Sequence, residues 1–134
     1  MNEQKINVCR ALASIFASKD EVTDNEAAFV GRTALDLGLD EGELKLVQQS
    51  LATALDTKEL LKTVTDTTLR RFLLRRIVAA TLIDSELNER ERRVIDTVTE
   101  TFGWDKGVVA DFVGHMQKFI EMEKKGEALL SRLG

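Results

Sequence analysis

The sequence contains no proline and only one cysteine, one histidine and one tryptophan. Without proline, no helix is interrupted by a residue that lacks an amide proton, and an aromatic content of 5% favours helices over strands. A single cysteine cannot form a disulfide within the chain, and Cys9 with His115 cannot supply the ligands of a structural zinc site. Any metal bound by this chain should therefore be held by oxygen atoms.

Apolar runs long enough to cross a membrane are also absent, and the first residues carry no secretion signal. We therefore expect a cytoplasmic protein without membrane insertion. The formal net charge of −4 argues against nucleic acid as a partner, because proteins that bind it present a basic face to the phosphates. With 134 residues, of which 43% are hydrophobic and 31% charged, the chain should form one globular domain over residues 1–134.

Apolar residues recur at helical spacing along the chain, and residues typical of helix starts and stops separate the segments. Three pairs have capping-box spacing: Thr23 and Glu26, Asp40 and Glu43, and Asn88 and Glu91. The expected helices run over residues 3–18, 23–37, 40–56, 67–83 and 88–102, and from 105 to a break at Gly126. The last of them should bury Val109, Phe112, Val113, Met116, Phe119 and Ile120. This pattern predicts an all-α bundle of six or seven antiparallel helices.

The sequence also repeats itself when it is shifted by 65 places. Without any gap, Glu26 falls on Glu91, and the stretch 37–42 falls on the stretch 102–107. The repeat predicts two units of helix, acidic turn and helix, related by a pseudo-two-fold axis. These units cover residues 6–47 and 71–112.

The helix expected over residues 67–83 is apolar on two sides, with Leu73 and Ile77 on one and Val78 and Leu82 on the other. A helix of this kind is usually central, with the other helices packed around it. We therefore predict that Leu73 and Ile77 are fully buried.

The polar side of the same helix is basic. It holds Arg70, Arg71, Arg75 and Arg76. These arginines either pair with carboxylates of this chain or meet an acidic partner or a phosphate. Because an acidic chain offers internal partners first, we expect Arg75 or Arg76 to contact a carboxylate of the same chain.

Acidic residues gather between the helices expected over 67–83 and 88–102. Helix capping explains Glu91, but it does not explain Asp84 or Glu86. Asp84 follows the carboxyl end of a helix, where the helix dipole destabilises a carboxylate by about 0.3–1 kcal/mol. A cation should therefore lie nearby, either an arginine or a bound metal.

An EF-hand is excluded at this corner. Counting from Asp84 places Glu89 at the glycine position and Ile95 at the position of the last glutamate ligand. Catalytic triads, phosphate-binding glycine loops and zinc motifs are absent too, so we expect no enzymatic activity. Two interpretations of the corner stay open: helix caps and ion pairs alone, or a site for a hard divalent cation or a partner.

The stretch Ala79–Glu91 carries a resemblance to a known family. An alanine-rich helix is followed by Asp, a small residue, an acidic residue, an aliphatic residue, polar residues and Glu, and Phe102–Trp104 continues the pattern. This order resembles the TerB-like family of tellurite-resistance proteins, whose relatives include the N-terminal domains of DjlA-type co-chaperones. Ala13–Leu39 fits more loosely. The family's usual Asp-Gly pair is Asp84-Ser85 here.

The resemblance implies an all-helical domain with pseudo-two-fold symmetry and a role in stress response at a membrane-associated complex. It also implies acidic residues that bind a divalent metal, and the cation would be calcium, magnesium or manganese. Carried over by position, the ligands are Asp84, Glu86 and Glu91, with Asp20, Glu21 and Glu26 in the first copy.

The alternative function is a helical protein–protein interaction module that binds no metal. In that case the acidic residues are helix caps and ion pairs, and a groove or the arginine strip meets a partner protein. The oligomeric state is open, and a homodimer is one option.

Overall fold

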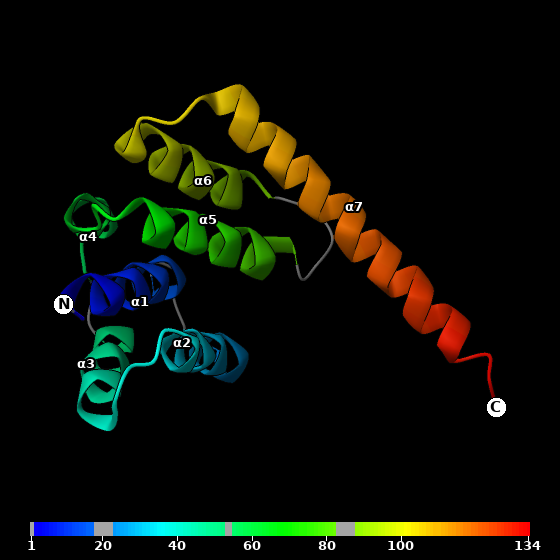
Figure 1. The fold of residues 1–134 in the computed structure, drawn as a ribbon, viewed down its shortest axis with the longest axis horizontal. Helices are drawn as coiled ribbons and strands as arrows, with labels where there is room; N and C mark the ends of the chain where they lie inside the picture. The colour runs from blue at the N-terminus through cyan, green and yellow to red at the C-terminus, as the bar shows by residue number, and fades with distance from the viewer. Residues whose placement is uncertain (1, 18–22, 53–54, 83–87) are drawn as a thin grey trace. The chain divides into compact units, whose positions relative to one another are not determined.

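The computed structural model of the protein describes residues 2–17, 23–52, 55–82 and 88–134. Over these ranges the chain forms seven α-helices and no strand, which confirms the predicted all-α class (Figure 1). The helices are α1 (Glu3–Ala17), α2 (Asp24–Asp36), α3 (Glu41–Leu51), α4 (Thr57–Thr63), α5 (Thr67–Thr81), α6 (Glu89–Phe102) and α7 (Lys106–Leu130). No helix in the described part of the chain is long and apolar enough to span a membrane.

The predicted capping boxes close the starts of α2 and α3. The Thr23 hydroxyl accepts a hydrogen bond from the Glu26 N–H at 3.1 Å, and the Glu26 carboxylate accepts one from the Thr23 N–H at 3.0 Å. Asp40 and Glu43 make the same pair of bonds, at 2.8 and 2.9 Å. Each box satisfies two amide groups that a helix start leaves without intrahelical partners.

Two predicted helix ends were wrong. The third helix ends at Leu51 instead of near Asp56, and Asp56 is the cap of α4, where it accepts a hydrogen bond from the Glu59 N–H at 3.3 Å. The last helix does not break at Gly126 but continues to Leu130. One glycine costs a helix about 1 kcal/mol relative to alanine, and the good helix formers around Gly126 outweigh that cost.

The repeat at 65 residues holds in the local structure. The helices α2 and α3 begin at Asp24 and Glu41, and α6 and α7 begin 65 residues later. Gly38 and Gly103 end the paired helices in the left-handed conformation, with φ of 76° and 68°. In both turns the next residue donates to a helical carbonyl, Leu39 to Ala34 at 3.1 Å and Trp104 to Thr99 at 3.0 Å. The two copies therefore build the same corner between their second and third helices.

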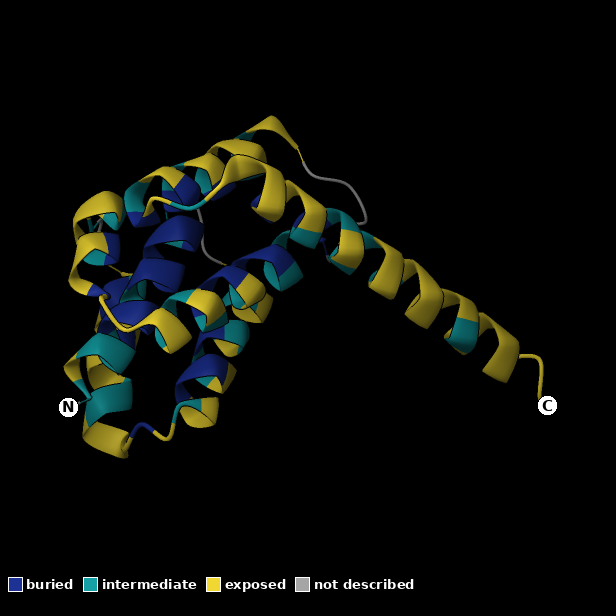
Figure 2. Cartoon of the chain, turned by 45° about the horizontal axis from the view of Figure 1, so that its top comes forward, coloured by how far each residue is buried: buried dark blue, intermediate teal, exposed yellow. Residues whose placement is uncertain are grey.

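The chain divides into two compact units, Met1–Arg76 and Ile77–Gly134, and each is described by itself. In the first unit, α1 packs against α2, α3 and α4, and α2 also contacts α3. In the second unit, α6 packs against α7. Almost every residue in the second half of α1 is buried (Figure 2).

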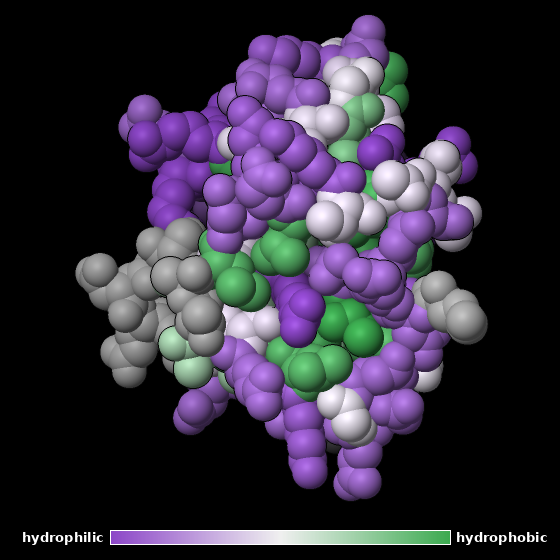
Figure 3. Space-filling model, turned by 90° about the vertical axis from the view of Figure 1, so that its left-hand side faces the viewer, coloured by the Kyte–Doolittle hydropathy of each residue, from purple (hydrophilic) through white to green (hydrophobic). Residues whose placement is uncertain are grey.

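Burial along α5 agrees with the prediction from its two apolar sides. Leu73 and Ile77 are 0% and 1% exposed, and Val78 and Leu82 are buried as well. Cys9 on α1 is a core residue with no exposed surface. By contrast, the face drawn in Figure 3 is mostly hydrophilic and shows hydrophobic side chains only in limited patches.

We predict that Leu73→Ala and Ile77→Ala each lower the free energy of unfolding by about 2–5 kcal/mol, because each leaves a cavity in a packed core. Urea unfolding followed by circular dichroism measures the change. Leu35→Ala is the matched control, since Leu35 lies on α2 with 66% of its surface exposed and should change stability by less than about 0.5 kcal/mol. Equal stability of all three variants would show that α5 is not a core helix.

Candidate functional site

Four of the six predicted cation ligands, Asp20, Glu21, Asp84 and Glu86, lie outside the described residues. The other two, Glu26 and Glu91, occupy equivalent positions in the first turns of α2 and α6. Within the described ranges, no three acidic, histidine or cysteine side chains come together as metal ligands would. The cation site predicted at these acidic residues therefore stays a prediction.

The two described corner glutamates have different surroundings. Glu26 is partly exposed, and its carboxylate takes part in the cap on Thr23. The Glu91 N–H donates to the Asn88 side chain at 2.8 Å, and the Oε2 atom of Glu91 is buried. A buried carboxylate oxygen keeps its charge only beside donors or cations, so Glu91 is the more informative of the two positions for substitution.

Of the four arginines on the polar side of α5, Arg76 contacts other side chains of the same chain. Its guanidinium forms a salt bridge with Asp36 on α2, which confirms the prediction of an internal carboxylate partner. The same group lies over two aromatic rings, 5.6 Å from the centroid of Phe29 and 5.2 Å from that of Phe72. Such contacts suit the planar guanidinium better than the compact ammonium group of lysine. Arg76 therefore links α5 to α2 inside the first unit.

The other three arginines do not join Arg76 in one site. The Nε atom of Arg70 donates to the carbonyl of Val64 at 2.7 Å, so this side chain bonds the turn that precedes α5. Arg71 and Arg75 are exposed. Two of the four arginines thus have structural contacts, and an acidic partner would find only the other two on the surface.

Cys9 is unsuited to nucleophilic chemistry. The thiol has no exposed surface, and burial raises its pKa to about 12, an effect that the positive charge of Arg76 only partly offsets. A cysteine reacts as the thiolate, which is nearly absent at neutral pH when the pKa is this high. The single histidine, His115, is exposed on α7.

We predict that native protein at pH 8 is not labelled by a thiol reagent such as dithionitrobenzoate, and that labelling appears in step with unfolding in urea. The same burial sets a pH dependence. Native Cys9 keeps its proton up to pH about 12, whereas the unfolded chain releases it near pH 8.5, so its contribution to stability falls as the pH rises between these values.

Cys9→Ala is the control for this loss, because the alanine variant lacks the titrating group and should lose less stability than the parent between pH 8.5 and 10. Rapid labelling of folded protein would contradict the buried position of Cys9.

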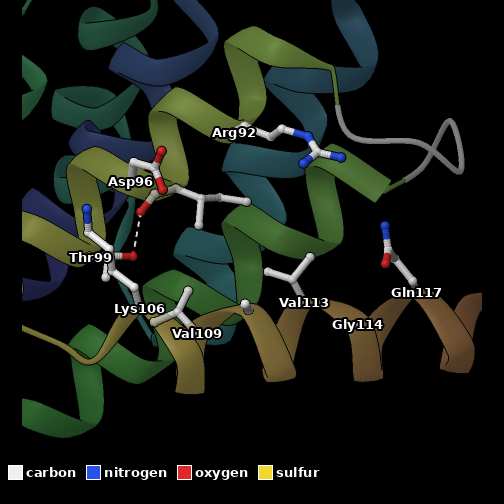
Figure 4. A pocket seen from close by; sticks show the side chains of 10 residues that line it. Arg92, Asp96, Thr99, Lys106, Val109, Val113, Gly114 and Gln117 are labelled. Carbon is white, nitrogen blue, oxygen red and sulfur yellow. Dashed lines mark hydrogen bonds between the residues drawn. The ribbon is translucent and has the colours of Figure 1, made fainter.

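A groove of about 340 Å³ lies between α6 and α7 in the second unit (Figure 4). Apolar side chains from both helices line it, with Ile95 from α6 and Val109 and Val113 from α7. Charged and polar side chains complete the lining: Arg92, Asp96, Thr99, Lys106 and Gln117. The Thr99 hydroxyl donates to the Ile95 carbonyl at 2.7 Å, so it is already bonded within α6. The lining is suited to binding an amphipathic segment, and it holds neither cysteine nor histidine.

A second hollow, of about 280 Å³, lies in the first unit between α1, α3 and the chain around α4. Arg10 supplies its one charged group, beside Leu46, Leu55 and Leu60. The Nε atom of Arg10 is buried without a hydrogen-bond partner among the described residues. The leucines make this hollow mainly apolar, and it is open to solvent.

The outer half of α7 and the turn that follows it carry a set of exposed apolar side chains that we call the α7 stripe. Its members, with their exposed fractions, are Phe119 (52%), Met122 (71%), Leu129 (61%), Leu130 (60%) and Leu133 (75%). Figure 2 shows this part of α7 as almost wholly exposed. Only Val109 and Val113, in the inner half, are buried.

The predicted burial of Phe119 was therefore wrong, and Phe112, Met116 and Ile120 are only half-buried. The cause is length: α7 has 25 residues and α6 has 14, so α7 runs past the helix that packs against it. Helical periodicity in the sequence identified the apolar positions correctly. It could not show which of them have a neighbouring helix.

Comparison with known proteins gave no match to this chain among protein-family models, curated proteins or solved structures.

Proposed function

We propose that this chain is a non-catalytic helical interaction module that binds another polypeptide through the α7 stripe. One observation carries the proposal: four large apolar side chains along the outer half of α7, and Leu133 just after its end, are each more than half exposed. Scattered apolar residues on a surface are ordinary, but a contiguous patch of several hundred Å² is typical of a protein–protein interface.

The energetics favour an occupant on this surface. Covering one of these half-exposed side chains is worth on the order of 1 kcal/mol, and the stripe has five of them. The helix is continuous with the inner half of α7, whose Val109 and Val113 are buried in the folded unit. Because the helix is already formed, binding does not require the free energy that ordering a disordered segment would cost.

The chemistry of two side chains supports the non-catalytic part of the proposal. Covalent catalysis by a cysteine would need an accessible thiol next to a base. Cys9 is buried and protonated, and His115 stands alone on α7 without a cysteine or histidine near it in the sequence.

The test is site-specific photo-crosslinking in cells. A photo-reactive amino acid at Met122, in the stripe, should give a defined adduct. The same amino acid at Ala128, which is exposed on the other side of α7, is the matched control and should give little. The adduct at Met122 should also disappear when Leu129→Glu is introduced, because a carboxylate cannot be buried there without a partner. Equal adducts at both positions, or none at Met122, would contradict an interaction through the stripe.

We propose divalent-cation binding as a second candidate, in a stress-response role of the kind that the TerB-like resemblance implies. The supporting observation is the repeat: Glu26 and Glu91 have equivalent places in two helix starts that lie 65 residues apart. The ligands would be these glutamates with Asp20, Glu21, Asp84 and Glu86. An all-oxygen site should bind calcium, magnesium or manganese, weakly and in preference to zinc.

Calorimetry of the parent and of Asp84→Asn, with and without millimolar calcium or manganese, tests this candidate. Cation binding to the folded state should raise the melting temperature of the parent by mass action, and Asp84→Asn should abolish that rise. If Asp84 only suffers from the helix dipole, the asparagine variant should instead be more stable than the parent without any cation. If neither calcium nor manganese changes the melting temperature of the parent, the cation site is ruled out.

A further inference from the structure

We propose that the polypeptide bound to the α7 stripe is a second copy of this chain, and that the two copies associate as a short parallel coiled coil over the end of α7, residues 118–130. This inference rests on the proposed function, because it names the occupant of the same surface. It is carried by the spacing of the stripe and by the charges beside it.

The spacing is that of a coiled-coil seam. Phe119, Met122, Gly126, Leu129 and Leu133 follow one another at alternating intervals of three and four residues. In a heptad written abcdefg, this order places them at positions a, d, a, d and a, which face the partner helix in a two-stranded coil. The first four of these positions lie on α7, and Leu133 lies in the turn that follows the helix.

Charges on the flanks select the direction of the second helix. The two g positions on α7 beside the seam, Lys118 and Lys125, are both basic. The first complete heptad has Glu123 at its e position. In a parallel pair, Lys118 of each copy lies next to Glu123 of the other, whereas an antiparallel pair brings basic g positions against one another. Opposite charges therefore favour the parallel arrangement.

Two further features of the seam agree with a neighbouring helix. Leu130 occupies the second e position and widens the apolar surface beside Leu129. Gly126 lies on the seam near the carboxyl end of α7, and a Cβ added there would meet no atom within 4 Å. Contacts within the described part of the chain therefore do not require a glycine at this place, although glycine weakens a helix. The missing side chain leaves room for a second backbone to approach.

The expected association is weak and depends on concentration, because fewer than two heptads of α7 bury little surface compared with a standard interface. Sedimentation velocity of the full chain, from micromolar to near-millimolar concentration, should show exchange between monomer and dimer. Met122→Glu should raise the dissociation constant by at least about tenfold, because each dimer would bury two unpaired carboxylates. Ala128→Glu adds the same charge off the seam and should leave the constant unchanged. Circular dichroism should show both variants folded.

A charge exchange tests the parallel arrangement. Lys118→Glu alone places two carboxylates together at each flank, and Glu123→Lys alone places two ammonium groups together, so each variant should dimerise less than the parent. Mixing the two variants should restore the dimer, because each flank of the mixed pair then joins one carboxylate to one ammonium group. One flank pairs the two substituted side chains, and the other pairs the unchanged Lys118 of one copy with the unchanged Glu123 of the other. In an antiparallel pair these positions are not neighbours, and mixing would restore nothing.

The outcomes separate the two proposals. A chain that stays monomeric up to near-millimolar concentration overturns the second copy as the occupant, and crosslinking from Met122 to a different protein would then leave the interaction function intact. Crosslinking to the same chain, together with restored dimerisation in the mixture, supports both proposals. Mixed variants that remain as weak as each alone overturn the parallel register.

Discussion

Burial of α1 is the constraint on which the first unit depends. From Asn7 to Phe16 every residue except Arg10 is buried, because α2, α3 and α4 all pack against this helix. A polar residue in such a helix must find its hydrogen bonds inside the protein. Ser14 does so twice: its hydroxyl donates to the Ala11 carbonyl at 2.7 Å and accepts from the Thr57 hydroxyl at 2.7 Å. The second bond fixes the start of α4 against α1. The chemical inertness of Cys9 follows from the same burial.

The parts of the fold that could be predicted from the sequence are those set by nearby residues. A capping box involves only four consecutive residues. The boxes of Thr23 with Glu26 and of Asp40 with Glu43 could therefore be predicted from their spacing alone. The left-handed turns at Gly38 and Gly103 could be predicted for the same reason, because a glycine directly after a helix is a local signal. The repeat added information, because two copies of one pattern are less ambiguous than a single copy. The break expected at Gly126 was wrong because a single local signal competed with a whole helix of good formers.

The parts that depend on distant neighbours could not be predicted in the same way. Phe119 has the spacing of a core residue, yet it is 52% exposed. Apolar periodicity identifies the apolar face of a helix, but it does not show whether another helix packs against that face. The burial of α1 on all sides could not be predicted either. The positions outside its apolar face hold alanine and serine, and these small side chains allow neighbouring helices to pack against them. The arginine strip resolved into separate roles for Arg70 and Arg76 only when their partners, Val64 and Asp36, were known.

The continuity of α7 has a mechanical consequence. Its inner half forms one wall of the groove opposite Ile95, its outer half carries the α7 stripe, and no break separates the two halves. A helix of 25 residues without a break behaves nearly as a stiff rod, so a tilt at its outer end is passed along the axis to its inner end. A protein that tilted α7 at Leu129 would therefore also tilt the groove wall at Val109 and Val113, and it would change the width of the groove.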